Sequence, residues 1–324
     1  MCRVSALGFS AIMMSGCHHL AERHWEMIFL DKDGRVLLTA VSQTEVFLGA
    51  RPRLQQVLQT EAFCERASYD PLSGRLVTVE RGGEHGEVVR VYEGDGTVVG
   101  EYSVDPDRTG RVCCSPSLSP GGQRVAFLGD LATVFWAEVG KGQEGFVWEL
   151  WKLWSSVPDD TRTARFAWHG GRECCWIDES TLACACVTAS WREPIFEIDV
   201  VSHRGRLLFG HGEIAGVANG RPVAVVQRQS SFELHDANSK TVLASARAGF
   251  SFPAFVGISS CGEYCAYWAL TPWRRRARYY VHHLESGRRT WLRIPEDWTL
   301  QSWNERMNGT ATKRETESLA DSGD

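Results

Sequence analysis

Short apolar runs alternate with glycine turns along most of the chain. In the clearest example, Ser119–Phe127, a Pro-Gly-Gly turn is followed by two polar residues and then by Val125, Ala126 and Phe127. Versions of this pattern occur six times, around Gly34, Gly74, Gly122, Glu179, Gly220 and Gly262, and the fourth has lost its glycine. Glycine adopts positive φ angles without steric cost, and the apolar residues after it are typical of a buried strand. The pattern therefore predicts six β-hairpins.

The spacing of these copies indicates the architecture. Neighbouring copies lie 40 to 57 residues apart, close to the ~40–50 residues of a β-propeller blade. A second hairpin follows most copies, as where Val88–Tyr92 and Val98–Tyr102 flank a Gly-Asp-Gly turn. Only Leu54–Glu65 has a helical spacing of apolar residues. We therefore predict an all-β fold, a single six-bladed β-propeller of four-stranded antiparallel blades over residues 25–296.

One hairpin also carries a resemblance to a known group of proteins. Ser119–Phe127 resembles the Ser-Pro-Asp-Gly-x-x-x-Ala-Phe hairpin of TolB-like and WD-repeat-like propellers, with Gly121 in the place of the aspartate. As a rhythm of turns and strands the resemblance extends over residues 25–296. It implies the propeller fold, and it implies no particular function, because propellers serve many.

The two ends differ from this central part. Arg3, the uncharged stretch Val4–Met14 and the sequence Ser-Gly before Cys17 resemble a bacterial lipoprotein signal. In that interpretation residues 1–16 are removed and a lipid on Cys17 anchors the protein to a membrane. The alternative is that residues 1–24 are the leader of a soluble protein. Residues 297–324 are predicted to be a polar, disordered tail.

Cysteine number and charge bear on location and partners. Without Cys2 and Cys17 nine of the eleven cysteines remain, and an odd number disfavours export to an oxidising compartment. A cytoplasmic protein is therefore favoured over an envelope lipoprotein. The 35 basic and 40 acidic side chains leave a net charge of −5, which gives no general attraction to nucleic acid or anionic lipid. We expect membrane contact only through a lipid on Cys17.

The densest basic run is the best candidate binding site. Trp273 is followed by Arg274, Arg275 and Arg276. Arginine offers forked donors to a carboxylate or phosphate, and tryptophan offers a stacking face. The alternative is that the run is an ordinary solvated connection between two strands.

Four cysteines form a second cluster. Cys174 and Cys175 are separated by eight residues from Cys184, and Cys186 follows. On a hairpin turning near Glu179, Cys175 and Cys184 would lie nearly opposite. Small buried core residues are the first interpretation, a cross-strand disulfide the second and a zinc site the third. The same interpretations apply to Cys113 with Cys114 and to Cys261 with Cys265.

The sequence contains no catalytic motif. G-x-S-x-G, H-E-x-x-H and P-loop patterns are absent, and we expect neither a cofactor nor a metal. The favoured function is a non-catalytic propeller scaffold that binds a protein or another ligand. One alternative is a metal-dependent hydrolase or lactonase with carboxylates from several blades on the axis. Another is an envelope lipoprotein that docks a partner.

Overall fold

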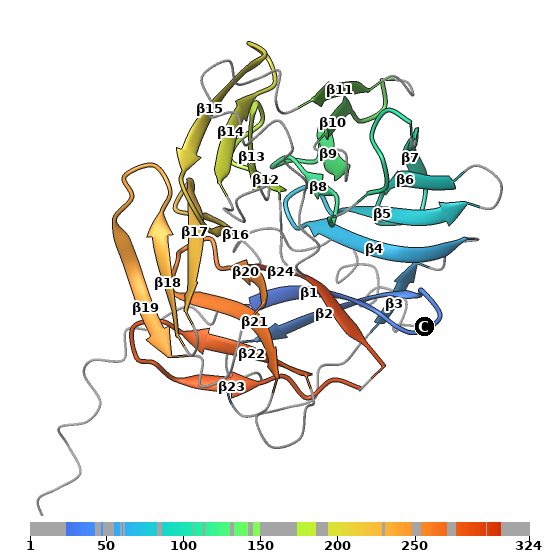
Figure 1. Ribbon diagram of the computed structural model, residues 1–324. Helices are drawn as coiled ribbons and strands as arrows, with labels where there is room; N and C mark the ends of the chain where they lie inside the picture. The colour runs from blue at the N-terminus through green and yellow to red at the C-terminus, as the bar shows by residue number, and fades with distance from the viewer. Residues whose placement is uncertain are drawn as a thin grey trace, which may run out of the picture.

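The described residues form twenty-four strands. The computed structural model describes residues 24–42, 47, 55–58, 60, 62–82, 86–105, 107–112, 114–129, 133–141, 145–149, 174–185, 194–228, 231–247, 254–270, 277–295 and 297–305. The strands form six antiparallel sheets of four strands each, arranged around a central axis (Figure 1). The predicted six-bladed β-propeller is confirmed.

Each sheet is one blade, and within five of them the strands follow chain order. The first blade contains β24 (Thr299–Glu305), β1 (His24–Leu30), β2 (Val36–Ser42) and β3 (Gln55–Leu58). The second contains β4 (Phe63–Asp70), β5 (Arg75–Gly82), β6 (Gly86–Tyr92) and β7 (Val98–Ser103). The third contains β8 (Ser117–Leu118), β9 (Arg124–Gly129), β10 (Thr133–Glu138) and β11 (Phe146–Glu149).

The remaining blades repeat this arrangement. The fourth contains β12 (Cys174–Trp176), β13 (Thr181–Ala185), β14 (Ile195–Asp199) and β15 (Arg204–Phe209). The fifth contains β16 (Glu213–Ala218), β17 (Arg221–Arg228), β18 (Ser231–Asp236) and β19 (Val242–Arg247). The sixth contains β20 (Ala254–Ile258), β21 (Tyr264–Leu270), β22 (Ala277–His283) and β23 (Arg289–Trp291).

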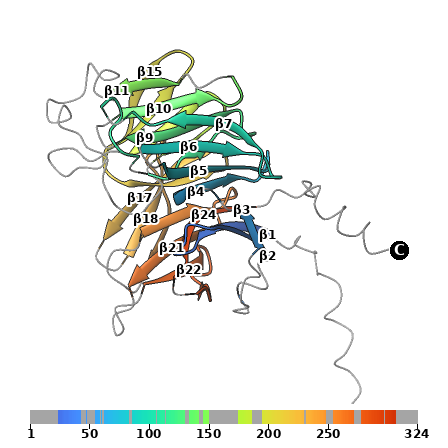
Figure 2. The ribbon, with the colours of Figure 1, turned by 90° about the vertical axis from the view of Figure 1, so that its right-hand side faces the viewer.

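The hydrophobic core is divided among the six interfaces between blades. Each interface has its own cluster of buried apolar side chains. In β5, for example, Val77 and Val79 pack toward the third blade, whereas Leu76 packs toward the first. Successive side chains of a strand point to opposite faces, so a sheet covered on both sides needs apolar residues at consecutive positions. Figure 2 shows the blades stacked on one another from the side.

The chain termini close the ring. β24 pairs antiparallel with β1, with Met27 opposite Trp303, so the first blade takes its innermost strand from the end of the chain. The innermost strands β24, β4, β8, β12, β16 and β20 contact one another in that order around the ring. The prediction that residues 297–324 form a tail is therefore wrong for Thr299–Glu305.

Two further sequence predictions need correction. The apolar residues of Leu54–Glu65 have a helical spacing, but within this segment Gln55–Leu58 is β3 and Phe63 begins β4. The six copies of the glycine repeat also do not occupy equivalent positions in their blades. Gly74 lies in the turn between the first two strands of its blade, as do the later copies, whereas Gly34 lies between β1 and β2, the second and third strands of the first blade.

Candidate binding surface on the sixth blade

The predicted binding residues come directly before β22 (Ala277–His283) in the sequence. Trp273, Arg274, Arg275 and Arg276 lie outside the described residues, and so does Cys17. The chain enters the described part again at Ala277, the first residue of β22. What the structure shows of this region is therefore the pair of strands β22 and β23, which form the outer edge of the sixth blade.

Arginine and aromatic side chains gather on one face of these two strands. Tyr280 is opposite Trp291 and His282 is opposite Arg289, so these four side chains share a face. The Arg278 guanidinium carbon lies 4.2 Å from the centroid of the Trp291 ring, and that of Arg293 lies 5.6 Å from it. We call Arg278, Arg289, Trp291 and Arg293 the blade-six edge. Three of its members come from a stretch that sequence reasoning passed over.

Two arginines of this edge, Arg278 and Arg293, lack a carboxylate partner among the described residues. Arg206 and Arg221 on the fourth and fifth blades pair with Glu197 and Asp236. Arg278 and Arg293, in contrast, make no ion pair within the described part of the chain, and their contacts are with the Trp291 ring. Trp291 itself is 39% exposed. The edge thus presents two cations on an accessible aromatic face, a combination that suits carboxylates and extended acidic segments.

The histidine on this face, His282, is buried. His282 is only 3% exposed, and neither of its ring nitrogens has a hydrogen-bond partner among the described residues. Its ring packs near those of Phe232 and Tyr267. Burial lowers the pKa of His282 from 6.5 to about 4, and the charges of Arg289 and His283 add to this effect. The imidazole is therefore neutral at pH 7, and its protonation is unfavourable in the folded protein.

The buried imidazole predicts an acid-sensitive propeller. The unfolded chain takes up a proton at His282 near pH 6.5, whereas the folded protein does so only near pH 4. Between these values the unfolded state binds more protons, so stability falls as the pH drops through this range. We expect His282 to account for a loss on the order of 2 kcal/mol, measured as the free energy of unfolding in urea at pH 7 and pH 4.5.

Two variants separate this effect from other titrations. In His282→Leu the free energy of unfolding should differ much less between pH 7 and pH 4.5 than in the wild type, because leucine suits the apolar surroundings and does not titrate. His283→Gln, which replaces the neighbouring histidine against the Tyr264 ring, should keep most of it. The prediction is wrong if the wild type and His282→Leu lose equal stability between pH 7 and pH 4.5.

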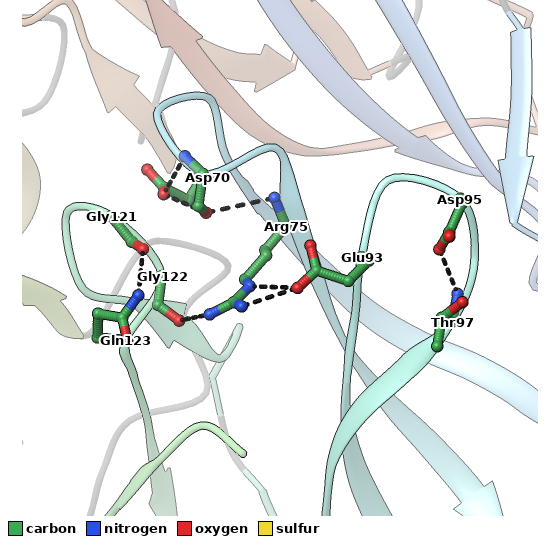
Figure 3. Close-up of polar contacts among 9 residues, drawn as sticks. Asp70, Arg75, Glu93, Asp95, Thr97, Gly121, Gly122 and Gln123 are labelled. Carbon is green, nitrogen blue, oxygen red and sulfur yellow. Dashed lines mark hydrogen bonds and ion pairs between the residues drawn. The ribbon is translucent and has the colours of Figure 1, made fainter. Parts of the chain in front are cut away.

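Charged and polar residues in the turns between the first two strands of each blade form hydrogen bonds that join neighbouring blades. Arg75 donates from Nε and Nη2 to Glu93 Oε1 at 3.0 and 2.7 Å, and from Nη1 to the carbonyl oxygen of Gly122 at 2.7 Å (Figure 3). This last bond joins the second blade to the third. Ser119 likewise donates to Glu179 Oε2 at 2.8 Å, which joins the third blade to the fourth. These turn residues have structural partners and leave little charge for a ligand.

A buried carboxylate lies between the first and second blades. Glu80 of β5 is fully buried, and it accepts hydrogen bonds from Thr78 Oγ1 at 2.7 Å and Tyr92 OH at 2.6 Å. Arg90 Nη1 donates to its other oxygen at 2.5 Å, while Arg90 Nε donates to Glu101 at 2.8 Å. The hydrogen bond with Glu101 raises the pKa of Arg90, and burial raises the pKa of Tyr92. Every carboxylate oxygen of Glu80 is bonded, so the group is structural.

The cysteine cluster differs from its predicted register. Cys174 pairs with Cys184 across the β12–β13 hairpin, and Cys175 pairs with Ala183, so the prediction that Cys175 faces Cys184 is wrong by one residue. Both side chains of the vicinal pair are buried, on opposite faces of the blade. Within the ranges that the structure describes, no group of three His, Cys, Asp or Glu side chains is placed to hold a metal ion. No described helix has the length and apolar character needed to cross a bilayer.

Comparison with known proteins supports the fold. The sequence matches no protein-family model and no curated protein. TolB from Acinetobacter baumannii superposes with a TM-score of 0.55 at 11% identity, over 88% of this chain and 66% of TolB. The chain has a TolB-like propeller fold. A chain from the nidogen/laminin complex gives a TM-score of 0.57 at 10% identity, over 87% of this chain and 98% of that one. At these identities the likeness concerns the fold alone.

Proposed function

We propose that this propeller is a non-catalytic scaffold that binds a protein partner, and that the blade-six edge receives an acidic segment of that partner. The observation that carries the proposal is the placement of Arg278 and Arg293 on the exposed Trp291 ring without a carboxylate partner in the described part of the chain. Arginine and tryptophan are the side chains most enriched at the energetic centres of protein interfaces.

The rest of the molecule is consistent with a binding role. Both faces of the blades are used in packing, so the propeller is a rigid frame that holds its edge strands in place. β23 is the outermost strand of its blade, and such an edge strand can receive a further strand from a second chain. One structural neighbour also comes from a complex of two proteins, nidogen and laminin. These observations favour a protein over a small substrate.

The charge of the edge fits an acidic partner better than it fits nucleic acid. The whole chain carries a net charge of −5, and a nucleic-acid surface is expected to spread basic side chains over many phosphates. The blade-six edge is instead local: Arg278 and Arg293 lie against the Trp291 ring, and Arg289 lies over the Tyr280 ring. A few carboxylates, each bonded by a forked guanidinium, match this arrangement in number and geometry.

Binding of a defined acidic peptide tests the proposal. The probe is a fluorescein-labelled 12-residue peptide of glutamate and tyrosine, and fluorescence anisotropy measures its Kd. We expect the double variant Arg278→Ser, Arg293→Ser to bind about tenfold more weakly, since two charge-assisted contacts are lost. The matched control Arg204→Ser, Arg247→Ser removes two exposed charges from the outer strands β15 and β19 and should leave the Kd within twofold.

Two results would contradict this function. Equal weakening by both double variants would show that the peptide responds only to total charge. Binding of an oligothymidine of the same charge as tightly as the peptide would point to nucleic acid as the partner. Each variant should keep the wild-type Tm within about 2 °C, because arginines that are exposed or partly exposed and make no ion pair among the described residues contribute little to stability.

A further inference from the structure

Two buried thiols from neighbouring blades touch each other. Cys114 lies just before β8 in the third blade, and Cys174 is the first residue of β12 in the fourth. Their Sγ atoms are 3.7 Å apart, although the residues are 60 positions apart in the chain. Cys114 is 1% and Cys174 2% exposed. The contact therefore links two blades inside the core.

The surroundings of this pair set it apart from the other cysteines. Cys114 and Cys174 belong to the apolar cluster between the third and fourth blades, with Trp136 and Phe196 nearby. Among the described residues, the Cys174 thiol has one further polar contact besides that with Cys114, a long one of 4.0 Å with the carbonyl oxygen of Ser115. Hydrogen bonding to Cys114 and burial together raise the pKa of Cys174. The Cys174 thiol is thus protonated at neutral pH, and its sulfur atom lies against that of Cys114.

We propose that Cys114 and Cys174 form a disulfide between the third and fourth blades when the protein meets a low-molecular-weight disulfide such as oxidised glutathione. The thiolate of one cysteine attacks the glutathione disulfide, forms a mixed disulfide and releases one glutathione thiol. The second cysteine attacks this mixed disulfide, forms the Sγ–Sγ bond and releases the second glutathione thiol. The two cysteine protons end on the released thiols, and the glutathione disulfide gains the two electrons that the cysteines lose.

The exchange requires transient separation of the two blades. A thiol that is nearly fully buried and protonated is a poor nucleophile, and a glutathionyl group cannot occupy its place in the packed interface. The reaction therefore takes place during folding or in a partly opened state, and the packed ring then holds the two sulfurs together. This predicts slow exchange in the native protein and faster exchange at sub-denaturing urea concentrations.

The bond would fasten one of the six interfaces of the ring. A disulfide that closes a loop of 60 residues restricts the unfolded chain and should stabilise the folded state. We expect the Tm of the oxidised protein to rise by about 5 °C. The inference does not depend on the proposed function, since it concerns the core and not the blade-six edge.

Redox equilibration followed by peptide mapping tests the proposal. The full-length protein is incubated to constant composition in mixtures of reduced and oxidised glutathione with sub-denaturing urea, then acidified, alkylated with N-ethylmaleimide and digested without reduction. Mass spectrometry should find a linked peptide pair containing Cys114 and Cys174, two hydrogens lighter than the sum of the free peptides. Its share should rise with the fraction of oxidised glutathione and disappear on treatment with dithiothreitol.

Single substitutions identify the sulfur atoms involved. Cys114→Ser and Cys174→Ser should each abolish both the linked pair and the rise in Tm on oxidation. Cys175→Ser, which changes the vicinal cysteine packed toward the fifth blade, should leave both intact. The proposal is overturned if Cys114 and Cys174 are both alkylated at every glutathione ratio, or if Cys174 is found linked to Cys184 in their place.

Discussion

A chain that ends after Pro295 will fail to form a stable propeller, whereas a chain that ends after Met307 will fold normally. The shorter chain lacks β24 and with it the innermost strand of the first blade. We expect the longer one to keep the wild-type Tm within about 2 °C, because it loses only polar sequence beyond the last described strand. Thermal unfolding followed by circular dichroism measures both.

The expected loss is large because β24 packs into the interface with the sixth blade and also pairs with β1. Trp303 is fully buried against Trp25, with ring centroids 5.4 Å apart, and Leu300 packs in the same cluster with residues of the sixth blade. Removing the strand also exposes the backbone groups of β1 that now pair with it. Two large apolar side chains and a row of hydrogen bonds amount to more than about 5 kcal/mol, which is comparable with the whole stability of many domains.

A point substitution separates packing from chain length. Trp303→Ala keeps β24 but leaves a cavity between Trp25 and the sixth blade, and it should cost about 3–5 kcal/mol in the free energy of unfolding. The neighbouring change Gln301→Ala, at a partly exposed position, should cost less than about 1 kcal/mol. A chain ending after Pro295 that unfolds cooperatively at the wild-type Tm would show that the ring closes without β24.

The blade count was predictable from sequence because the turns and the packing leave local signals. Gly74, Gly122, Gly220 and Gly262 all have positive φ angles in first-hairpin turns. The apolar residues after them are buried on both faces of a blade, so they form continuous runs. Gly34 shows the limit of this reasoning. Gly34 has a positive φ and lies in a hairpin turn. Because the first blade takes its innermost strand from β24, the first strand of the blade in chain order, β1, is the second from the axis, and Gly34 therefore joins the second and third strands.

The closing strand was missed because a β-bulge disrupts its alternation. In the pairing of β24 with β1, Ser302 is opposite Ile28 and Leu300 is opposite Phe29, so Gln301 is the extra residue. Leu300 and Trp303 therefore reach the same cluster although they are three positions apart, a spacing that no regular strand pattern predicts. A long-range pairing of chain ends also leaves no local signal in the sequence.

The sequence predicted only part of the candidate surface. The density of Arg274, Arg275 and Arg276 is a clear sequence signal, but the alternation of Arg289 and Trp291 also places two side chains on one face of β23. Arg293 follows that strand. The contact of Arg278 with Trp291 could not be predicted, because it depends on the register of β22 against β23.

Removing the carboxylate of Glu80 is expected to have the largest effect of any single polar substitution considered for this protein. Glu80→Ala leaves the partly buried Arg90 without its inner partner and leaves the hydroxyls of Thr78 and Tyr92 without an acceptor. Removing one partner of a buried ion pair lowers the free energy of unfolding by more than the intact pair contributes, because the remaining groups stay desolvated. We expect a loss of about 3 kcal/mol in the free energy of unfolding, measured in urea at pH 7.

The same arginine provides the matched control. Glu101 also pairs with Arg90, at 2.8 Å, but its side chain is 41% exposed, so Glu101→Ala should cost less than about 1 kcal/mol. The double variant Glu80→Met, Arg90→Met replaces both buried charges with apolar side chains and should be more stable than Glu80→Ala alone. If Glu80→Ala costs no more than Glu101→Ala, then water reaches Glu80 in the folded protein, and the buried network does not stabilise the second blade.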